Sequence, residues 1–361
     1  MRIFHLEAGA HMYGGALQVL LLVEGLQRRG VDCLLAVPRG SEVEAEAMSR
    51  GLPVRGIPMA GEADPLLPFR VRWAVRAFRP DLVHLHSRRG ADTLGALGAS
   101  WSGVPVLLTR RVDNPEPAWL VGPKYRLPQR VIAISEAIRA VLLEKGVPEE
   151  KLRCVRSALD AGPYLRPCDR ETFLRNFGLE PGDRVVGMAA QFIPRKGHDV
   201  LLQAAPAVLR RHPRTRFLLF GRGPMLGEIA QRVGSEGLGD AVQLPGFRPD
   251  LPQILPCLDL LVHPAMMEGL GIVLLQASAS GIPVVASAVG GIPEAVVHQE
   301  TGMLVPPGDP HALAEAVSFL LDRPERAREM GARGRQRVLE EFSVDRMVEG
   351  NLAVYREMLA D

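Results

Sequence analysis

Residues 267–277 combine a carboxylate with closely spaced glycines, a pattern suited to holding a phosphorylated sugar. Glu268 is followed by Gly269 and Gly271, and glycines let a ligand approach the backbone closely. Apolar runs flank this stretch, and a Gly-Gly pair at residues 290–291 follows the second run. The order predicts strand, glycine-rich turn, helix, strand, Gly-Gly turn and helix. Each helix would begin with unpaired backbone N–H groups and the positive end of its dipole, which bind phosphate. The stretch therefore predicts a site for a nucleotide diphosphate sugar.

A cationic pair, Arg195 and Lys196, follows a predicted strand at residues 185–190 and precedes a predicted helix. One interpretation is a solvated lysine at a helix start. A cation is disfavoured at the N-terminal end of a helix dipole, so a phosphate is a sensible partner for it. Lys196 is therefore a candidate for binding the diphosphate.

Strands and helices alternate along most of the chain, an order that is typical of parallel α/β sheets. A stretch rich in proline and polar residues at 157–182 interrupts the alternation and predicts a connector. The length of 361 residues favours two domains, and we place their boundary near residue 165. Helices are expected at residues 310–321, 324–341 and 344–359. The predicted strands are residues 3–7, 32–37, 81–86, 104–109, 130–135, 185–190, 217–220, 242–244, 260–263, 284–287 and 303–305.

The two halves of the chain contain a strand–helix–strand unit of equal length. Asp81 and Gly103 mark it in the first half, Asp259 and Gly281 mark it in the second, and each pair is separated by 22 positions. Any such unit tends to look alike, but the match favours two doubly wound domains that face each other. Ligands bind beyond the carboxyl ends of such strands, so we expect the site in the cleft between the domains.

Charge is unevenly distributed, although the net charge is only +2. Residues 65–130 hold 11 Arg and Lys residues against 4 Asp and Glu residues. Either a solvated surface or contact with an anionic acceptor or a membrane face explains this excess. The composition, 47% hydrophobic and 23% charged, is ordinary for a soluble globular protein. We expect no nucleic-acid partner.

The four cysteines, Cys33, Cys154, Cys168 and Cys257, form no close pair in the sequence, so neither a zinc site nor a redox motif is indicated. We expect four reduced thiols in a cytoplasmic protein. The chain begins directly with a predicted strand, and no apolar run is long enough to span a membrane. We therefore expect a cytoplasmic location, at the inner face of the plasma membrane.

The ordered set of motifs along the chain resembles family 4 (group 1) glycosyltransferases, which are retaining enzymes of the GT-B architecture. A single Gly-x-Gly would be weak, whereas the ordered set is specific. The resemblance implies two Rossmann-like, doubly wound parallel-sheet domains facing across a cleft. These are an acceptor domain at residues 1–165, a donor domain at residues 166–341, and a C-terminal helix at residues 342–361 that crosses back to the first domain. The matching pieces are residues 14–15, 131–136, 195–197, 201–202, 220–224, 246–247, 268–276, 290–294, 301–305 and 307–309.

The resemblance also implies roles for single residues. Lys196 matches the donor-phosphate lysine, with Arg195 beside it, and Glu268 matches the first glutamate of a paired-glutamate motif, which approaches the donor sugar. Two positions depart from the family: Gln191 replaces an arginine, and Gln276 replaces the second glutamate, which binds the ribose. Glutamine both donates and accepts hydrogen bonds, so we expect Gln276 to hold the ribose without a charge. The other donor-binding candidates are Gly14, Gly15, Gly221, Arg222, Gly246, Phe247, Gly269, Leu270, Gly271, Gly290 and Gly291.

The acceptor is expected in the first domain. Where the family often has a histidine, this chain has Arg110 and Arg111, followed by Asp113. The arginines are either a surface pair or ligands for the diphosphate or for an anionic acceptor.

Histidines end two equivalent strands, one in each half. We expect His84 to be a buried, hydrogen-bonded core residue, and His86 to lie on the opposite face of its strand and line the cleft. His263 is the equivalent candidate in the second domain.

These features predict a metal-independent, retaining glycosyltransferase that needs no cofactor. The nucleotide diphosphate leaves the anomeric carbon while Lys196, Arg195 and the helix N-termini stabilise its charge, and the acceptor hydroxyl attacks from the same face. The sequence contains no Asp-x-Asp motif. The expected partners are a nucleotide sugar and an anionic glycan or glycolipid, in cell-envelope glycan or lipopolysaccharide synthesis, with peripheral membrane contact.

Two alternatives stay open. A sugar-nucleotide epimerase or a phosphorylase would share the architecture, although a phosphorylase needs a lysine for pyridoxal phosphate, and lysines are few here. A non-catalytic nucleotide-sugar-binding subunit is favoured by Gln191 and Gln276 and opposed by the intact Lys196 and Glu268.

Overall fold

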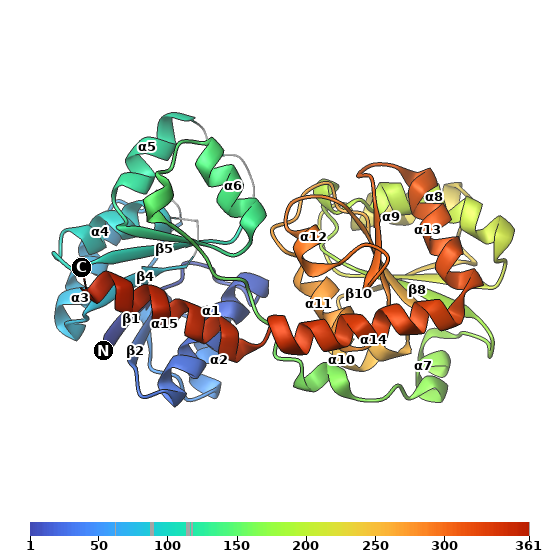
Figure 1. Cartoon of the computed structure of the whole chain (residues 1–361), viewed down its shortest axis with the longest axis horizontal. Helices are drawn as coiled ribbons and strands as arrows, with labels where there is room; N and C mark the ends of the chain where they lie inside the picture. Colours follow the sequence, from blue (N-terminus) through green and yellow to red (C-terminus); the bar gives the residue numbers. More distant parts are fainter. Residues whose placement is uncertain (62, 87–89, 113–115, 117, 361) are drawn as a thin grey trace. The chain divides into compact units, whose positions relative to one another are not determined.

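The computed structural model describes residues 1–361 except 62, 87–89, 113–115, 117 and 361. The chain folds as two compact units, one made of residues 1–158 and 344–361 and the other of residues 159–343. Each unit is built on one parallel β-sheet with helices packed against it (Figure 1). The predicted fold class, two Rossmann-like doubly wound sheets, is confirmed.

The sheet of the first unit has seven parallel strands in the order β3-β2-β1-β4-β5-β6-β7. Its strands are β1 (Arg2–Leu6), β2 (Asp32–Pro38), β3 (Val54–Ile57), β4 (Leu82–Leu85), β5 (Val106–Arg110), β6 (Arg130–Ala133) and β7 (Leu152–Cys154). Its helices are α1 (Gly14–Arg28), α2 (Glu42–Ser49), α3 (Leu67–Phe78), α4 (Ala96–Ser100), α5 (Ala118–Arg126), α6 (Glu136–Glu144) and α15 (Val344–Ala360), with a π-helical turn at Ala91–Gly95.

The first helix of the chain packs against the last one in this unit. Leu22 and Val23 on α1 and Val348 and Tyr355 on α15 are buried in one apolar cluster. Gly25 on α1 permits this close packing, because a Cβ added there would lie 2.5 Å from Cγ2 of Val348. Helix α15 is therefore part of the core of the first unit.

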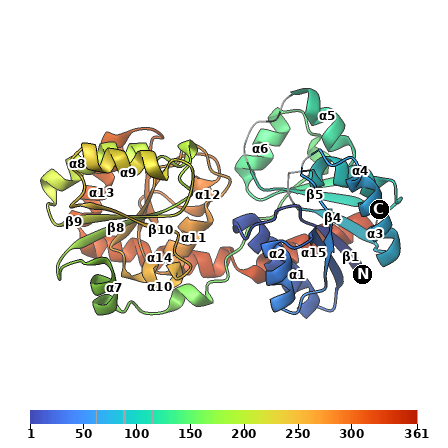
Figure 2. The same cartoon turned by 180° about the vertical axis from the view of Figure 1, so that it is seen from behind.

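Figure 2 shows the second unit from behind. Its sheet has six parallel strands in the order β10-β9-β8-β11-β12-β13. Its strands are β8 (Arg184–Ala189), β9 (Thr215–Phe220), β10 (Val242–Gly246), β11 (Leu260–His263), β12 (Val284–Ser287) and β13 (Gly302–Val305). Its helices are α7 (Arg170–Phe177), α8 (His198–Arg211), α9 (Leu226–Ser235), α10 (Leu251–Ile254), α11 (Ile272–Ala279), α12 (Ile292–Ala295), α13 (Pro310–Asp322) and α14 (Pro324–Glu341). Helices α8 and α13 pack together, as do α11 and α14.

Each sheet contains a point where the strand order reverses. In the first unit the chain runs from β1 outward to β3 and then returns to place β4 beside β1. In the second it runs from β8 outward to β10 and returns to place β11 beside β8. The loops that leave the two central strands diverge there, so a crevice forms at the carboxyl ends, where open α/β sheets bind their ligands.

The predicted strands are present, and the three C-terminal helices match their expected bounds within a residue or two. The strands β3 and β7 are not among the predicted ones, because both are short and each contains an arginine in place of a continuous apolar run. None of the helices in the described part of the chain is long and apolar enough to cross a membrane.

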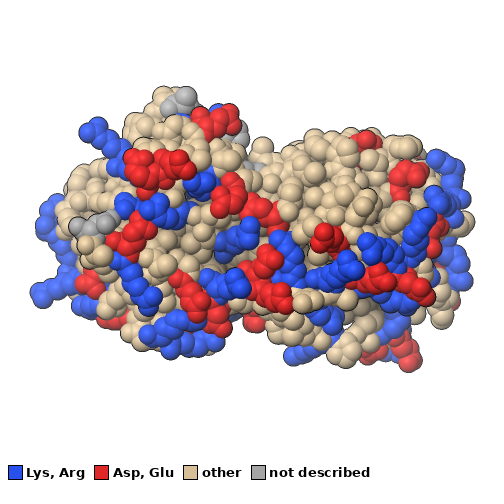
Figure 3. Space-filling model, viewed as in Figure 1, with Lys and Arg blue, Asp and Glu red and all other residues tan. Residues whose placement is uncertain are grey.

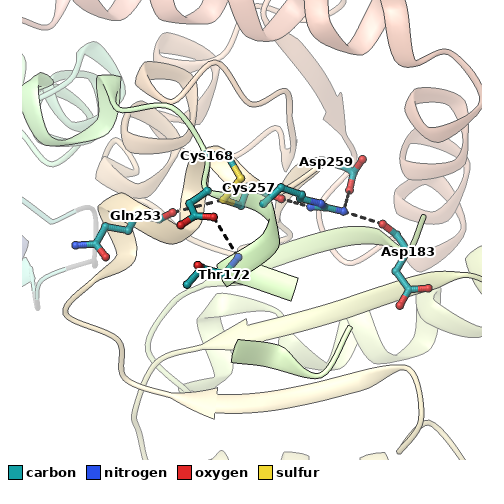
Figure 4. The surroundings of a disulfide bond; sticks show 8 residues. Cys168, Thr172, Asp183, Gln253, Cys257 and Asp259 are labelled. Atoms are coloured by element: carbon teal, nitrogen blue, oxygen red, sulfur yellow. Dashed lines mark hydrogen bonds and ion pairs between the residues drawn. A yellow bond between two sulfur atoms is a disulfide. The ribbon is translucent and has the colours of Figure 1, made fainter. Parts of the chain in front are cut away.

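The expectation of four reduced thiols is wrong for two of them. Cys168 and Cys257 form a disulfide, with Cα atoms 5.0 Å apart, while Cys33 and Cys154 are not disulfide-bonded. The bond joins the residue before the N-cap of α7 to the turn that leads into β11 (Figure 4). The two cysteines are 89 positions apart, so their spacing does not indicate the pair.

Candidate active site

The second unit places a lysine and a glutamate at its switch point. The turn after β8 ends at Lys196, and the loop after β11 carries Glu268. Nζ of Lys196 lies 2.5 Å from Oε2 of Glu268, and only 12% and 14% of the two side chains are exposed. The residues are 72 positions apart in the sequence, and they meet because β8 and β11 are neighbours in the sheet.

Two further groups hold the carboxylate of Glu268. Nε2 of His263 lies 2.8 Å from Oε2, and the backbone N–H of Gly269 donates to Oε1 at 3.2 Å. Burial alone would raise the pKa of Glu268, but the hydrogen bond with His263 and the positive charge of Lys196 outweigh it and hold the pKa well below its usual range. Glu268 is therefore ionised at neutral pH and fixed in position.

Close backbone contacts fix the two loops that carry this pair. Gly197 has a φ of +75°, and a Cβ added there would lie 1.8 Å from the carbonyl oxygen of Pro264. The N–H of Met266 donates to the carbonyl of Arg195 at 2.8 Å. Because only glycine fits at residue 197, the turn after β8 rests directly on the loop after β11.

Two predicted donor-binding glycines also serve backbone contacts. A Cβ on Gly291 would lie 2.1 Å from the carbonyl oxygen of Gly269, and the N–H of Gly291 donates to the carbonyl of Glu268 at 3.1 Å. A Cβ on Gly221 would lie 1.9 Å from the carbonyl oxygen of Ala190. Gly221 therefore allows the loops after β8 and β9 to touch, and Gly291 allows the loops after β11 and β12 to touch.

Lys196 does not itself open a helix, and the expectation of a phosphate partner took no carboxylate near it into account. Lys196 ends a 3₁₀ turn, Pro194–Lys196, and α8 begins two residues later at His198. Its anionic partner is Glu268 of the same unit. The charge of Lys196 is thus balanced by a carboxylate of the protein.

His198, which the sequence analysis did not single out, is a buried neutral residue near this pair. Its ring stacks on Phe192 with centroids 4.2 Å apart, and its nitrogens have no hydrogen-bond partner among the described residues. Burial, followed by the charges of His263 and Lys196, lowers the pKa of His198 to about 4. A histidine at the first position of a helix gives no signal of this burial in the sequence.

The remaining donor-side candidates follow the carboxyl ends of the same sheet. Gly246 ends β10, and the ring of Phe247 after it is 60% exposed. The guanidinium of Arg222 lies 5.0 Å from the centroid of that ring, a cation–π contact. Gln191 lies just beyond the end of β8, Leu270 and Gly271 precede α11, Gln276 lies on α11, and Gly290 precedes α12.

The first unit has a pocket of about 270 Å³ at its own switch point. Residues that follow β1, β4 and β5 line it, together with the first turn of α1. Four predicted residues, Gly15, His86, Arg110 and Arg111, are among them, and Gly14 opens α1 just before Gly15. Asp113, and Arg88 and Arg89 of the basic stretch, lie outside the described residues.

His84 and His86 do not lie on opposite faces of the strand as expected, because residues two apart in a strand share a face. Their ring centroids are 3.8 Å apart, and both side chains are buried. His84 is hydrogen-bonded to the hydroxyls of Tyr355 and Thr109, at 2.7 and 2.6 Å. Nε2 of His86 lies 2.9 Å from Nδ1 of His5, and His86 lines the pocket. His84 is therefore a core residue as predicted.

Within the described part of the chain, His5, His84 and His86 are the one group whose side chains lie close enough to share a metal ion. Burial lowers the pKa of all three. Both ring nitrogens of His84 are already hydrogen-bonded, and Nη2 of Arg111 lies 3.4 Å from Nδ1 of His86. A guanidinium so near repels a second cation, so the cluster fits a neutral hydrogen-bonded core better than a metal site.

Arg110 is not a surface residue, which rules out the surface-pair interpretation for it. Its Nη1 lies 2.9 Å from Oε1 of Glu116, and Nζ of Lys124 lies 2.5 Å from the same oxygen. Asp92 also binds Lys124, and all four side chains are buried. This ionic cluster fixes one wall of the pocket.

Arg111 places a second guanidinium in the pocket, and its charge is less neutralised than that of Arg110. None of the described carboxylates forms an ion pair with it, and its Nε is buried without a hydrogen-bond partner. Burial lowers the pKa of Arg111 to about 10 against the opposing effect of Glu7, so the guanidinium stays protonated at neutral pH. Arg111 is therefore the cation of this pocket best placed to meet an anionic ligand.

Glu7, Tyr13 and Asp92 also line the pocket, and the sequence analysis did not predict them. Glu7 directly follows β1, so its place at the carboxyl end of a central strand could have identified it. Asp92 lies on the π-helical turn Ala91–Gly95, and the sequence gives no sign of that turn.

Comparisons with known proteins identify the family. The model of Glycosyltransferase Family 4 matches residues 13–162, and that of Glycosyl transferases group 1 matches residues 169–337. Alpha-maltose-1-phosphate synthase of Mycolicibacterium smegmatis is 32% identical over 98% of each chain. The chain is a family 4, group 1 glycosyltransferase. The resemblance found in the ordered motifs is thereby confirmed.

Other relatives of this glycosyltransferase act in different settings. D-inositol 3-phosphate glycosyltransferase of Segniliparus rotundus is 31% identical over 78% of this chain and 67% of its own length. The lipopolysaccharide core biosynthesis mannosyltransferase LpsB of Rhizobium meliloti is 30% identical over 56% of this chain and 59% of its own length. These relatives share the family, while their names point to different products.

Solved structures share the fold of the glycosyltransferase at low identity. HepE of Anabaena, in complex with UDP and glucose, has a TM-score of 0.87 and 21% identity over 99% of each chain. A glycosyltransferase of Rickettsia africae has a TM-score of 0.88 and 19% identity, over 100% of this chain and 99% of its own. These likenesses show the GT-B fold.

Proposed function

We propose that this glycosyltransferase moves a sugar from a nucleotide diphosphate sugar to an acceptor hydroxyl, with retention of the anomeric configuration and without a metal ion. The observation that carries the proposal is the Lys196–Glu268 pair at the switch point between β8 and β11. The pair offers a cation to the diphosphate and a carboxylate to the sugar hydroxyls, at the position where open α/β sheets bind nucleotides.

In the proposed reaction, the bond from the anomeric carbon to the diphosphate oxygen breaks, and a bond to the acceptor oxygen forms on the same face. Lys196, Arg195 and the N-terminus of α11 stabilise the negative charge of the departing diphosphate, a task that a metal ion performs in other transferases. The acceptor proton passes to an oxygen of that diphosphate. Glu268 accepts a hydrogen bond from a hydroxyl of the donor sugar.

The nucleotide would lie along the carboxyl ends of β10 to β12. The amide of Gln276 would hold the ribose hydroxyls, a role that needs hydrogen bonds but no charge. Backbone N–H groups around Gly271 and Gly290 would approach the diphosphate, and Gly246 and Phe247 would adjoin the base. The loops after β11 and β12 touch at Gly291, and the N–H of Gly221 donates to the carbonyl of Gly246 at 2.9 Å, which supports this arrangement.

We propose that the pocket of the first unit takes an acceptor that bears a phosphate or a carboxylate. The charged guanidinium of Arg111 supports this, because guanidinium pairs well with such groups. The names of two relatives, which include inositol 3-phosphate and maltose-1-phosphate, support it as well. The relative in lipopolysaccharide core synthesis supports a cell-envelope glycan or glycolipid as the acceptor, handled at the inner face of the membrane.

Thermal unfolding in the presence of UDP, GDP, ADP, CMP and their sugar conjugates tests the donor site. A ligand that binds the folded state raises the Tm, so one nucleotide series is expected to do so. The absence of a shift with every nucleotide would overturn the donor site.

Transfer to phosphorylated and carboxylated sugar acceptors then tests the reaction. NMR of the product is expected to show the donor's anomeric configuration, and EDTA is expected to leave the rate unchanged. An inverted product would refute retention. A rate that EDTA abolishes and a divalent cation restores would refute metal independence.

A further inference from the structure

One face of α3 in the first unit exposes a row of large apolar side chains. Leu66, Phe69 and Trp73 are 53%, 58% and 65% exposed, and their spacing of three and four residues places them on one side of the helix. Trp101, which follows α4, is 40% exposed, and its ring centroid lies 5.4 Å from that of Phe69. We call these four residues the aromatic face. Apolar side chains gathered in this way on a surface mark an interaction site.

A groove of about 510 Å³ adjoins the aromatic face. It lies between β3 and α3, with Phe69 and Trp73 on its apolar side. Arg39, Arg55 and Arg70 supply its guanidinium groups, and that of Arg55 lies 5.2 Å from the ring centroid of Trp73. The groove therefore presents apolar and cationic groups side by side.

Most of the arginines around the aromatic face form no ion pair with a described carboxylate. Asp64 forms an ion pair with Arg70 at 2.7 Å. Arg39, Arg55 and Arg76 form no ion pair with any described carboxylate, and Arg39 and Arg76 are exposed. Figure 3 shows Lys and Arg side chains at the edge of the first unit where α3 lies. An anionic partner would complement this charge.

The geometry points to the aromatic face and its arginines as the surface that docks the enzyme on an anionic lipid bilayer. Tryptophan favours the boundary between headgroups and acyl chains, since its ring is apolar and its N–H is polar. Arginines beside it are attracted by lipid phosphates, and a helix with this pattern lies in the plane of the interface. The inference rests on the proposed function in one respect, because a lipid-borne acceptor is the reason for the enzyme to bind a membrane.

Vesicle sedimentation tests the docking surface. The full-length protein is expected to bind vesicles of phosphatidylcholine and phosphatidylglycerol in equal amounts, and not vesicles of phosphatidylcholine alone. Replacing Arg39 and Arg76 by glutamine is expected to weaken binding roughly 30-fold, since each arginine near the surface contributes about fivefold. Replacing Phe69 and Trp73 by serine is expected to weaken it at least about tenfold.

Matched controls come from other exposed positions. Trp119→Ser removes a side chain on α5 that is 77% exposed, and Arg328→Gln with Arg333→Gln removes two exposed charges from α14. Both controls are expected to bind like the wild type. Equal losses of vesicle binding in the test and control variants would overturn the inference. Failure of the wild type to bind anionic vesicles would overturn it as well.

Tryptophan fluorescence gives a second readout, and it uses a variant that keeps Phe69, Trp73 and the arginines beside them. The chain has three tryptophans, so replacing Trp101 and Trp119 by phenylalanine leaves Trp73 as the sole emitter. Anionic vesicles are expected to shift its emission to the blue, and to leave unchanged a variant that keeps only Trp119. An unshifted Trp73 would overturn the inference.

A reaction without membranes separates this inference from the proposed function. Transfer to a water-soluble acceptor, measured without vesicles, is expected to be the same for the wild type and for all variants of the aromatic face. Intact transfer together with failed vesicle binding would overturn the docking surface alone. Absent transfer in the wild type would instead refute the proposed reaction.

Discussion

Lys196 and Glu268 neutralise each other as an ion pair, and donor binding would change the partners of both residues. In the proposed complex, the diphosphate would compete with Glu268 for Lys196, while the sugar hydroxyls would offer Glu268 new hydrogen-bond donors. His263 and the N–H of Gly269 keep the carboxylate in place during this exchange. The pair can therefore change partners without leaving a buried charge alone.

Lys196→Ala is expected to lower kcat/KM by about 10²–10³, because it removes a charge that stabilises the leaving diphosphate. Lys145→Ala is a matched control, since Lys145 is an exposed lysine of the other unit. Initial rates of nucleotide release with a fixed acceptor measure the effect, and urea unfolding checks that both variants are folded. A rate for Lys196→Ala equal to that of the control would contradict the assignment.

The buried neutral ring of His198 predicts a pH dependence of stability. Burial lowers its pKa from 6.5 to about 4, so between these values the unfolded chain binds a proton that the folded chain does not. The free energy of unfolding therefore falls as the pH falls through this window, by about 3 kcal/mol for this residue. Below pH 4 the loss is complete.

His198→Leu removes this dependence while keeping the apolar contact with Phe192. Chemical denaturation of the wild type and the variant at pH 7 and pH 4 measures the difference. The wild type is expected to lose more stability than the variant on acidification. Parallel losses in the two proteins would show that His198 is protonated in the folded state.

At the scale of elements, the site depends on loops that follow parallel strands and touch through glycine. The turn after β8 packs against the loop after β11 at Gly197, and the loops after β11 and β12 touch at Gly291. Glycines in the motifs thus shape the site as well as leaving room for a ligand. The sequence marked their positions, but only the folded loops show which backbone each one faces.

Gly197→Ala is expected to destabilise the protein by roughly 3 kcal/mol or more and to lower transfer, because its Cβ would meet a backbone carbonyl that cannot move aside. Gly30→Ala is a matched control. Gly30 has the same φ of +75° but open space around it, so its variant is expected to lose only about 1 kcal/mol. Denaturant unfolding of both variants measures the difference, and equal losses would show that backbone conformation alone is responsible.

At the scale of the whole molecule, the two units repeat one plan. In each, a parallel sheet reverses its strand order once; Lys196 and Glu268 lie at one reversal, and the pocket lined by Arg111 lies at the other. The units differ in how their ends are secured. The first is completed by α15, and the second contains the disulfide between Cys168 and Cys257.

Replacing Cys168 and Cys257 by serine is expected to lower the free energy of unfolding of the second unit by about 4–5 kcal/mol, since the bond closes a loop of 89 positions. Cys154→Ser is the control, because that cysteine takes no part in the disulfide. Thiol titration of the unreduced, unfolded protein is expected to find two of the four thiols. Four reactive thiols would show that the bond does not form.

The sequence by itself determined the fold class, the family and the motif residues Lys196 and Glu268. Apolar runs alternate with helical patterns, and the motifs are contiguous, so both can be recognised without knowing what lies next to them in space. Neither the strand β3 nor the burial of His198 could be predicted from the sequence, because neither has a local pattern that differs from a turn or a solvated helix start.

Only the tertiary structure decided which distant residues meet. The partner of Lys196 is 72 positions away, the disulfide joins cysteines 89 positions apart, and Arg110 is buried by an ionic cluster rather than exposed. The aromatic face also needed the folded chain, because the apolar pattern of α3 does not tell which side chains the sheet covers. Strand order brings such groups together, and it is fixed by packing across the whole unit rather than by any one segment.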